Sequence, residues 1–180
     1  MNSLKIIGGV GISLLAYSLL KSKKGTTVKN PRTDQSQPLT QFLPIVQPLE
    51  MRNDPLGEGH FGASRGIRTH NGVDLVTFEG QKIFSPIDGV VVRYANPYPD
   101  DSRWKGILIQ GNGFFADTTV KIFYMNSMFF PSELIVAGQT IGISQAISQK
   151  HGSAMIDHIH VEVRQKGQLI DPYNLIFQTA

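Results

Sequence analysis

The sequence predicts an all-β protein, with a single antiparallel domain in the form of a β-sandwich or open barrel. Two observations lead to this prediction. Beyond residue 51 the chain consists of short runs rich in Ile, Val and Phe, and Gly, Pro and Asp separate these runs. Such alternation is typical of strands and turns. In addition, no run after residue 24 keeps the apolar period of a long helix.

Residues 51–180 are predicted to form this domain. Its expected strands lie in five segments, and the stretch QKGQ at 165–168 is expected to form a hairpin turn. The segments are KIFSPIDGVVVRY, GILIQG, TVKIFYM, ELIVAGQTIGI and HIHVEVRQKGQLI. Residues 25–50 are rich in Thr, Pro, Gln and Ser without lasting periodicity, so they are expected to form an extended linker.

Residues 1–24 predict a single-pass transmembrane helix that acts as a membrane anchor. The apolar segment from Leu4 to Leu20 is at the short end of the ~17–25 residues that cross a bilayer as a helix. A cleaved signal peptide is the alternative, but its positive charge should precede the apolar core. Here most of the charge follows it, in KSKK. By the positive-inside tendency, this cluster would keep the C-terminal domain on the cytoplasmic side.

Composition excludes several kinds of site. The chain has no cysteine, so any metal must be bound by imidazole and carboxylate groups. Of its 17 Lys and Arg residues, four lie in residues 1–24, and the remaining 13 nearly balance the 14 acidic residues. A near-neutral domain without a basic stripe argues against nucleic acid as a partner.

The stretch DHIHVEVR, residues 157–164, places two histidines one residue apart. In a strand, period-2 geometry sends His158, His160 and Glu162 to one face and the aliphatic residues between them to the other. Two imidazoles on one face can share a task, one binding a metal and the other moving a proton. The alternative is a half-exposed strand whose polar side contains histidine.

The stretch RTHNGVDLV places His70 and Asp74 four residues apart. A turn at Asn71-Gly72 that enters a strand could aim both side chains at one point. Together with a distant histidine they would supply three N/O ligands and leave a fourth position for water, as in catalytic zinc sites.

Four motifs, in order between Gly57 and Ile176, resemble the LytM-type, lysostaphin-like M23 zinc metallopeptidases. They are HNGVDL, GQKIFSPIDGVVV, VAGQTIGIS and DHIHVEVRQKGQLIDPYNLI. The resemblance implies a LytM-like fold and cleavage of the peptide cross-links of peptidoglycan. Peptidoglycan peptide would then be the substrate.

The resemblance also implies roles for individual residues. Zn²⁺ would be bound by His70, Asp74 and His160, and His158 would be catalytic. The family usually carries a second catalytic histidine in a Tyr-x-His sequence, but here Asn126 stands at that position. This chain resembles the leukocyte cell-derived chemotaxin branch in several segments. Proteins of that branch also lack this histidine and are not regarded as peptidases. The amide of Asn126 could still donate to an oxyanion, although it cannot relay a proton.

Further candidates lie in loops. His151 could reach the site from a loop, and the alternative is a solvated histidine without a role there. For His60 the alternatives are likewise a residue near the site and a surface residue. NPYPDDSRW contains Tyr98 and Trp104, whose flat faces suit sugar rings or peptide. An ordinary surface loop is the alternative interpretation.

Two functions remain open on sequence alone. One is a membrane-anchored zinc endopeptidase of the cell wall, for which His158 argues. The other is a catalytically inactive zinc-binding domain that binds wall or protein partners, for which Asn126 argues. The domain would face the periplasm and wall. The KSKK cluster, however, favours the cytoplasmic side. A location in the internal membrane of a virus particle, which would release the protein to the wall at infection, would ease this conflict.

Overall fold

The computed structural model describes residues 40–177. The predicted anchor, residues 1–24, and the first part of the predicted linker lie outside these residues. Among the helices of the described part, none has the length and apolar character that crossing a bilayer requires.

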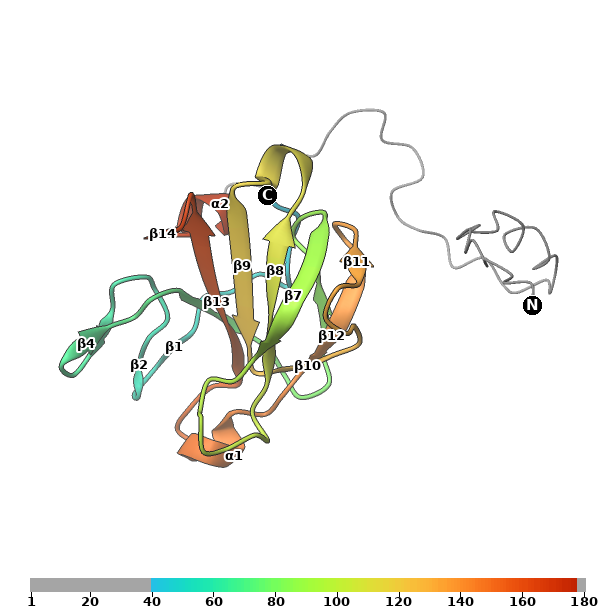
Figure 1. The fold of residues 1–180 in the computed structure, drawn as a ribbon. Helices are drawn as coiled ribbons and strands as arrows, with labels where there is room; N and C mark the ends of the chain where they lie inside the picture. Colours follow the sequence, from blue (N-terminus) through green and yellow to red (C-terminus); the bar gives the residue numbers. More distant parts are fainter. Residues whose placement is uncertain (1–39, 178–180) are drawn as a thin grey trace, which may run out of the picture.

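A seven-stranded antiparallel sheet forms the body of the domain (Figure 1). Its path runs β11-β7-β8-β9-β13-β14, and β5 also pairs with β13. In that order the strands are β11 (Leu134–Ile135), β7 (Gly89–Ala95), β8 (Gly106–Gly111), β9 (Thr118–Phe123), β13 (His158–Gln165) and β14 (Gln168–Ile170), with β5 at Val73–Val76. The strand β13 therefore has β9 on one side and β5 and β14 on the other.

A smaller sheet and two short hairpins complete the β-structure. The three-stranded sheet has the order β10-β12-β6, with β10 at Met125–Ser127, β12 at Thr140–Ser144 and β6 at Lys82–Phe84. The hairpins are β1 (Asn53–Asp54) with β2 (Gly57–Glu58), and β3 (Ser64–Arg65) with β4 (Arg68–Thr69).

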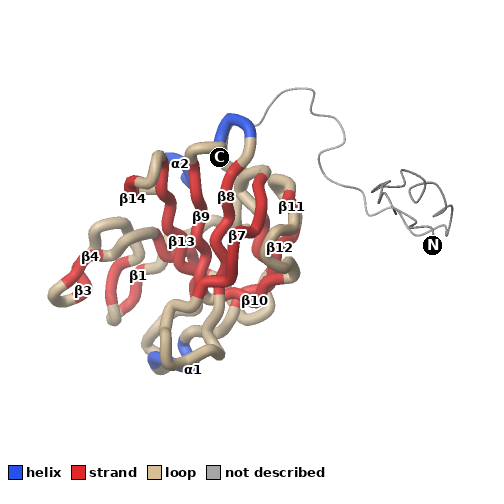
Figure 2. The backbone as a smooth tube through the Cα atoms, viewed as in Figure 1, coloured by secondary structure: helices blue, strands red, loops and turns tan. Residues whose placement is uncertain are grey.

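Helical structure is confined to short pieces in the described residues, as Figure 2 shows. They are the 3₁₀ turn η1 (Gly113–Phe115), α1 (Ser148–His151) and α2 (Tyr173–Phe177). The prediction of a predominantly β domain is confirmed.

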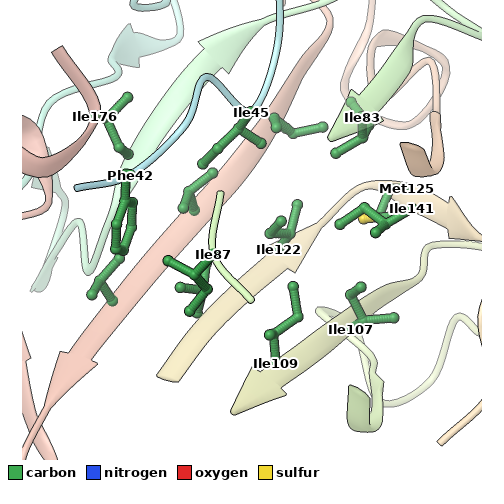
Figure 3. Packing of buried hydrophobic residues seen from close by; sticks show 14 of the residues in the cluster. Phe42, Ile45, Ile83, Ile87, Ile107, Ile109, Ile122, Met125, Ile141 and Ile176 are labelled. Atoms are coloured by element: carbon green, nitrogen blue, oxygen red, sulfur yellow. The ribbon is translucent and has the colours of Figure 1, made fainter. Parts of the chain in front are cut away.

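The hydrophobic core draws on both sheets (Figure 3). Ile159, Val161 and Val163 of β13 are fully buried, as the period-2 pattern predicts. Ile83 of β6 and Ile141 of β12 belong to the same cluster. The apolar face of β13 is thus held in the core, and its other face is left for the histidines.

The segment 42–46 also belongs to the core, although the sequence placed it in the linker. Phe42 and Ile45 are buried, and the Phe42 ring meets Phe115 edge-on at 5.3 Å between centroids. The backbone N–H of Leu43 donates to the carbonyl of Pro86 at 2.9 Å. The segment is irregular chain outside the named strands, so it carries no periodic signal. The folded domain therefore begins before residue 51.

The predicted hairpin turn joins β13 to β14. Gln165 and Gln168 are paired, and the two residues between them, Lys166 and Gly167, have φ values of 50° and 78°. Two consecutive positive φ values are the mark of a tight type I′ turn. The turn prediction is confirmed.

Candidate metal centre and active site

Three side chains from two neighbouring strands converge at one end of the sheet. Asp74 on β5 lies directly opposite His160 on β13 in the antiparallel register. His70 precedes β5, and the turn after it passes tightly against β13. A Cβ at Gly72 would lie 2.2 Å from the carbonyl oxygen of Val161. Only glycine permits this approach, which brings His70 beside the other two residues.

The facing atoms of the three side chains lie close together. The His70 Nε2 atom is 2.8 Å from His160 Nδ1 and 3.1 Å from Asp74 Oδ1. The distance from His160 Nδ1 to Asp74 Oδ1 is 2.9 Å. The structure thus brings the predicted ligand set together as a group able to hold a metal ion.

The outer atoms of both imidazoles are fixed by acceptors. Nδ1 of His70 donates to the carbonyl of His60 at 2.8 Å, and Nε2 of His160 donates to a carboxylate oxygen of Glu162 at 3.4 Å. Since each outer nitrogen carries the proton, each inner nitrogen presents a lone pair. Two lone pairs and a carboxylate oxygen facing one point repel one another unless a cation lies between them. Such fixing of the outer nitrogen is typical of metal-binding histidines.

The second oxygen of Asp74 is bound by two arginines that the sequence analysis missed. Arg52 donates from Nε to Asp74 Oδ2 at 3.2 Å, and Arg65 donates to the same oxygen at 3.3 Å. Arg52 is buried and also pairs with Asp54 at 2.8 Å. Because Arg52 lies 22 residues from Asp74 along the chain, no local sequence pattern predicts this contact.

The polar groups around Asp74 set its charge. Burial alone would raise the pKa of Asp74, but the polar side chains that face its carboxylate, His160 and His70 first among them, outweigh burial. The pKa of Asp74 therefore lies well below its usual range, and its carboxylate is ionised.

His158 faces the same centre without belonging to the close group. Its Nδ1 donates to the carbonyl of Ile156 at 2.7 Å, so the lone pair is on Nε2, which lies 3.7 Å from Asp74 Oδ1. Burial lowers the pKa of His158 below its usual value despite the attraction of Asp74. A neutral imidazole with a free Nε2 can accept a proton.

The centre opens into a cavity of about 310 Å³. All four predicted residues from the two histidine motifs line it: His70, Asp74, His158 and His160. Tyr98, Tyr124 and His151 line the same cavity. His151 is therefore a cavity residue, and its Nε2 lies 2.7 Å from the hydroxyl of Tyr98.

The other loop candidates lie outside the cavity. Trp104 is buried, so its ring does not face a substrate. The His60 side chain is about half exposed and lies 2.8 Å from Glu58 Oε2. It contributes to the centre only through its backbone carbonyl, which accepts from His70.

Asn126 is not placed with the other predicted site residues. It is exposed and lines a separate hollow with Tyr94, Asn96 and Lys105. Tyr124 has a φ of 64°, and this left-handed residue redirects the chain just before β10. As a result Tyr124 lines the cavity and Met125 enters the core. The role expected for Asn126, donation to an oxyanion, has no support in this position.

Comparison with known proteins identifies the family. Residues 68–172 match the sequence profile of peptidase family M23. The chain belongs to this family. The matched segment of the M23 domain contains His70, Asp74, His158 and His160, whereas Arg52 and the core segment 42–46 precede it.

Two individual proteins are similar to this chain in sequence. Leukocyte cell-derived chemotaxin-2 of Mus musculus is 32% identical over 110 residues, which cover 61% of this chain and 69% of that protein. The protein of the same name from Bos taurus is 28% identical over 110 residues, with the same coverage of both chains.

Solved structures show the fold. A zinc-containing peptidase from Vibrio cholerae matches with a TM-score of 0.52 and 19% identity over 73% of this chain. The antimicrobial peptidase lysostaphin from Staphylococcus simulans matches with a TM-score of 0.58 and 15% identity over 79% of this chain. The M23 domain spans 39% and 56% of these two chains, respectively. The LytM-like fold implied by the sequence resemblance is confirmed.

Proposed function

We propose that this M23 domain is a zinc-dependent endopeptidase that cleaves peptide cross-links of bacterial peptidoglycan. One observation carries the proposal. The unprotonated Nε2 of His158 faces the same end of the cavity as the three converging ligand atoms. A site that served stability alone would need no neutral histidine next to the ligands and no opening to solvent.

The donor set fits zinc. Two imidazole nitrogens and one carboxylate oxygen are the protein ligands of many catalytic zinc sites. Here His70, His160 and Asp74 would hold the ion, and Glu162, the His60 carbonyl and Arg52 keep their orientation. When bound, zinc would polarise the scissile carbonyl and lower the pKa of water toward ~7.

His158 carries the proton chemistry in this proposal. Its Nε2 accepts a proton from the attacking water and passes it to the leaving amine, while Nδ1 stays bonded to the Ile156 carbonyl. The bond at Nδ1 keeps the ring from turning. The same nitrogen atom can therefore serve in both steps.

A second candidate function is a zinc-binding domain without peptidase activity that binds cell-wall or protein partners. Two observations favour it. The chain lacks the histidine of the Tyr-x-His motif, and Asn126 lies outside the cavity. The ligand geometry is compatible with both functions, so zinc binding alone does not separate them.

We also propose that residues 1–24 anchor the protein to a membrane, with the domain facing the periplasm and cell wall or carried in the internal membrane of a virus particle. The apolar N-terminal segment supports this. Fractionation of the full chain and of a variant without residues 1–24 tests it. Recovery of both in the soluble fraction would contradict an anchor.

The peptidase proposal is tested with the full chain, loaded with zinc and incubated with purified cross-linked peptidoglycan. Fragments identified by mass spectrometry give the bond cleaved. We expect fragments from the wild type, none from His160→Ala, and none from His158→Ala although that variant keeps its zinc. Absence of release by the zinc-loaded wild type across several wall chemistries would favour the binding domain.

A further inference from the structure

The cavity is also lined by three residues whose polar groups have no role in the proposed reaction: Tyr98, Tyr124 and His151. The Tyr98 hydroxyl lies 2.7 Å from His151 Nε2 and 3.2 Å from the Tyr124 hydroxyl. The rings of Tyr98 and Tyr124 are stacked, with 6.2 Å between centroids. The groups thus form a chain from His151 through Tyr98 to Tyr124.

Two loops hold the outer part of this chain in place. Lys150 binds Asp101 Oδ2 at 2.9 Å, and its ammonium lies over the Tyr98 ring at 4.2 Å from the centroid. Gln145 donates to the carbonyl of Arg103 at 2.7 Å. The loop that contains Tyr98 is therefore pinned to the segment that ends in His151.

Tyr124 is the member of the chain nearest the reaction centre. Its ring meets that of His158 edge-on, with 5.4 Å between centroids. Burial raises the pKa of Tyr124 far above its usual value, so its hydroxyl keeps its proton. Tyr124 can act as a hydrogen-bond donor and not as a base.

The direction of these hydrogen bonds is set by which ring nitrogen of His151 carries its proton. With a proton on His151 Nε2, the three groups own three donor hydrogens but make only two contacts with one another. His151 donates to the Tyr98 oxygen, and Tyr98 donates to the Tyr124 oxygen. The Tyr124 proton is then left over, at the end next to His158.

We propose that Tyr124 donates this hydrogen bond to the substrate oxygen on which negative charge develops, and that Tyr98 and His151 position it. Tyr124 would thus supply the donor that the chain lacks in its Tyr-x-His motif. Tyr124 is the catalytic residue in this scheme, and the other two are positioning residues. The inference rests on the proposed peptidase function.

The test compares variants of the full, zinc-loaded chain on purified peptidoglycan. Tyr124→Phe is expected to lower kcat by ~10²–10³-fold, the usual cost of one oxyanion donor, with little change in KM. Tyr98→Phe and His151→Ala are expected to lower kcat less. His151→Gln should recover part of that loss, because its amide can still donate to Tyr98.

A matched control lies outside the cavity. Tyr173→Phe changes a half-exposed tyrosine on α2. It should retain wild-type kcat. Zinc content and thermal unfolding are measured for every variant, so that loss of the donor is separated from loss of the fold.

Each outcome bears on a different claim. Wild-type kcat in Tyr124→Phe would overturn the donor role and leave the peptidase proposal intact. Equal loss in His151→Gln and His151→Ala would overturn the positioning role of His151. A zinc-loaded wild type that releases no fragments would overturn the peptidase proposal, and the donor inference with it.

Discussion

The guanidinium of Arg52 donates from Nε to Oδ2 of Asp74 at 3.2 Å. This contact occupies one oxygen of the carboxylate, and the other oxygen is directed at His70 and His160. A carboxylate held in this way offers a single oxygen to a metal. Arg52 therefore fixes the orientation of a proposed ligand, although it lies outside the cluster itself.

Replacing Arg52 by Met is expected to weaken zinc binding by ~10–100-fold, the usual effect of removing a residue that orients a ligand. The free energy of unfolding should fall by about 3–5 kcal/mol, because buried carboxylates lose their partner. Chelator competition and urea unfolding measure the two effects. Arg93→Met, an exposed arginine on β7, is the control, and equal behaviour of the two variants would refute the assigned role.

Zinc should stabilise the folded domain by mass action. At a free zinc concentration ~1,000 times Kd, the gain is about 4 kcal/mol, seen as a higher Tm that a chelator reverses. His160→Ala should show almost none of this gain, since it removes one of three ligands. Tyr173→Phe, at a half-exposed position on α2, should respond like the wild type. A zinc-independent Tm in the wild type would contradict the assigned site.

Gly72 is predicted to tolerate no side chain. In Gly72→Ala the new Cβ would collide with the carbonyl of Val161, and the turn must move away from β13. Overpacking of this kind costs ~1–3 kcal/mol, and the displacement of His70 should weaken zinc binding as well. Asn71→Ala, at an exposed neighbouring position, is the control. Stability and zinc affinity unchanged in Gly72→Ala would show that the turn can adjust.

Phe42 tests where the domain begins. Truncating this buried ring to Ala should lower the free energy of unfolding by ~3–5 kcal/mol, measured by urea denaturation. Phe78→Ala is the matched control, because the Phe78 ring is 66% exposed. Similar stability of the two variants would mean that segment 42–46 does not contribute to the core.

The pair Lys121–Glu162 predicts a dependence of stability on pH. Burial opposes ionisation of Glu162, but hydrogen bonds from His160 and Lys121 lower its pKa from 4.5 to about 2. A carboxyl with a lowered pKa stabilises the fold above its unfolded pKa. That contribution is lost as the pH falls from about 4.5 to about 2.

The comparison with Lys121→Met isolates this contribution. In zinc-free protein, the wild type should be the more stable of the two above pH 4.5, and the difference should shrink as the pH approaches 2. Urea midpoints measured across this range give the difference directly. A difference that stays constant to the acid end would assign the stabilisation to packing of the Lys121 side chain.

Much of the fold and the ligand set could be predicted because the signals are local. Alternation along β13 assigns His158 and His160 to one face and the aliphatic residues to the core, whatever the neighbouring strands are. The spacing of His70 and Asp74 around a glycine likewise predicts a turn into a strand. The tight turn at Lys166-Gly167 depends on two adjacent residues, so it could also be predicted from the sequence.

The errors concern contacts between distant parts of the chain. Segment 42–46 is too short to show a period, yet it packs on residues far along the sequence. The motif position of Asn126 suggested the site, but a left-handed residue at Tyr124 changed which side chain lines the cavity. The pairing of Arg52 with Asp74 left no pattern at all.

The sequence by itself determined that the domain is built of strands, and which residues could serve as metal ligands, since both follow from residue type and short spacing. The tertiary structure alone decided what surrounds those ligands: the arginines on Asp74 and the chain from His151 to Tyr124. Arg65 lies nine residues from Asp74, and the other contacts join side chains 22 to 53 residues apart. Only the pairing of strands and the packing of loops bring their polar atoms within hydrogen-bonding distance.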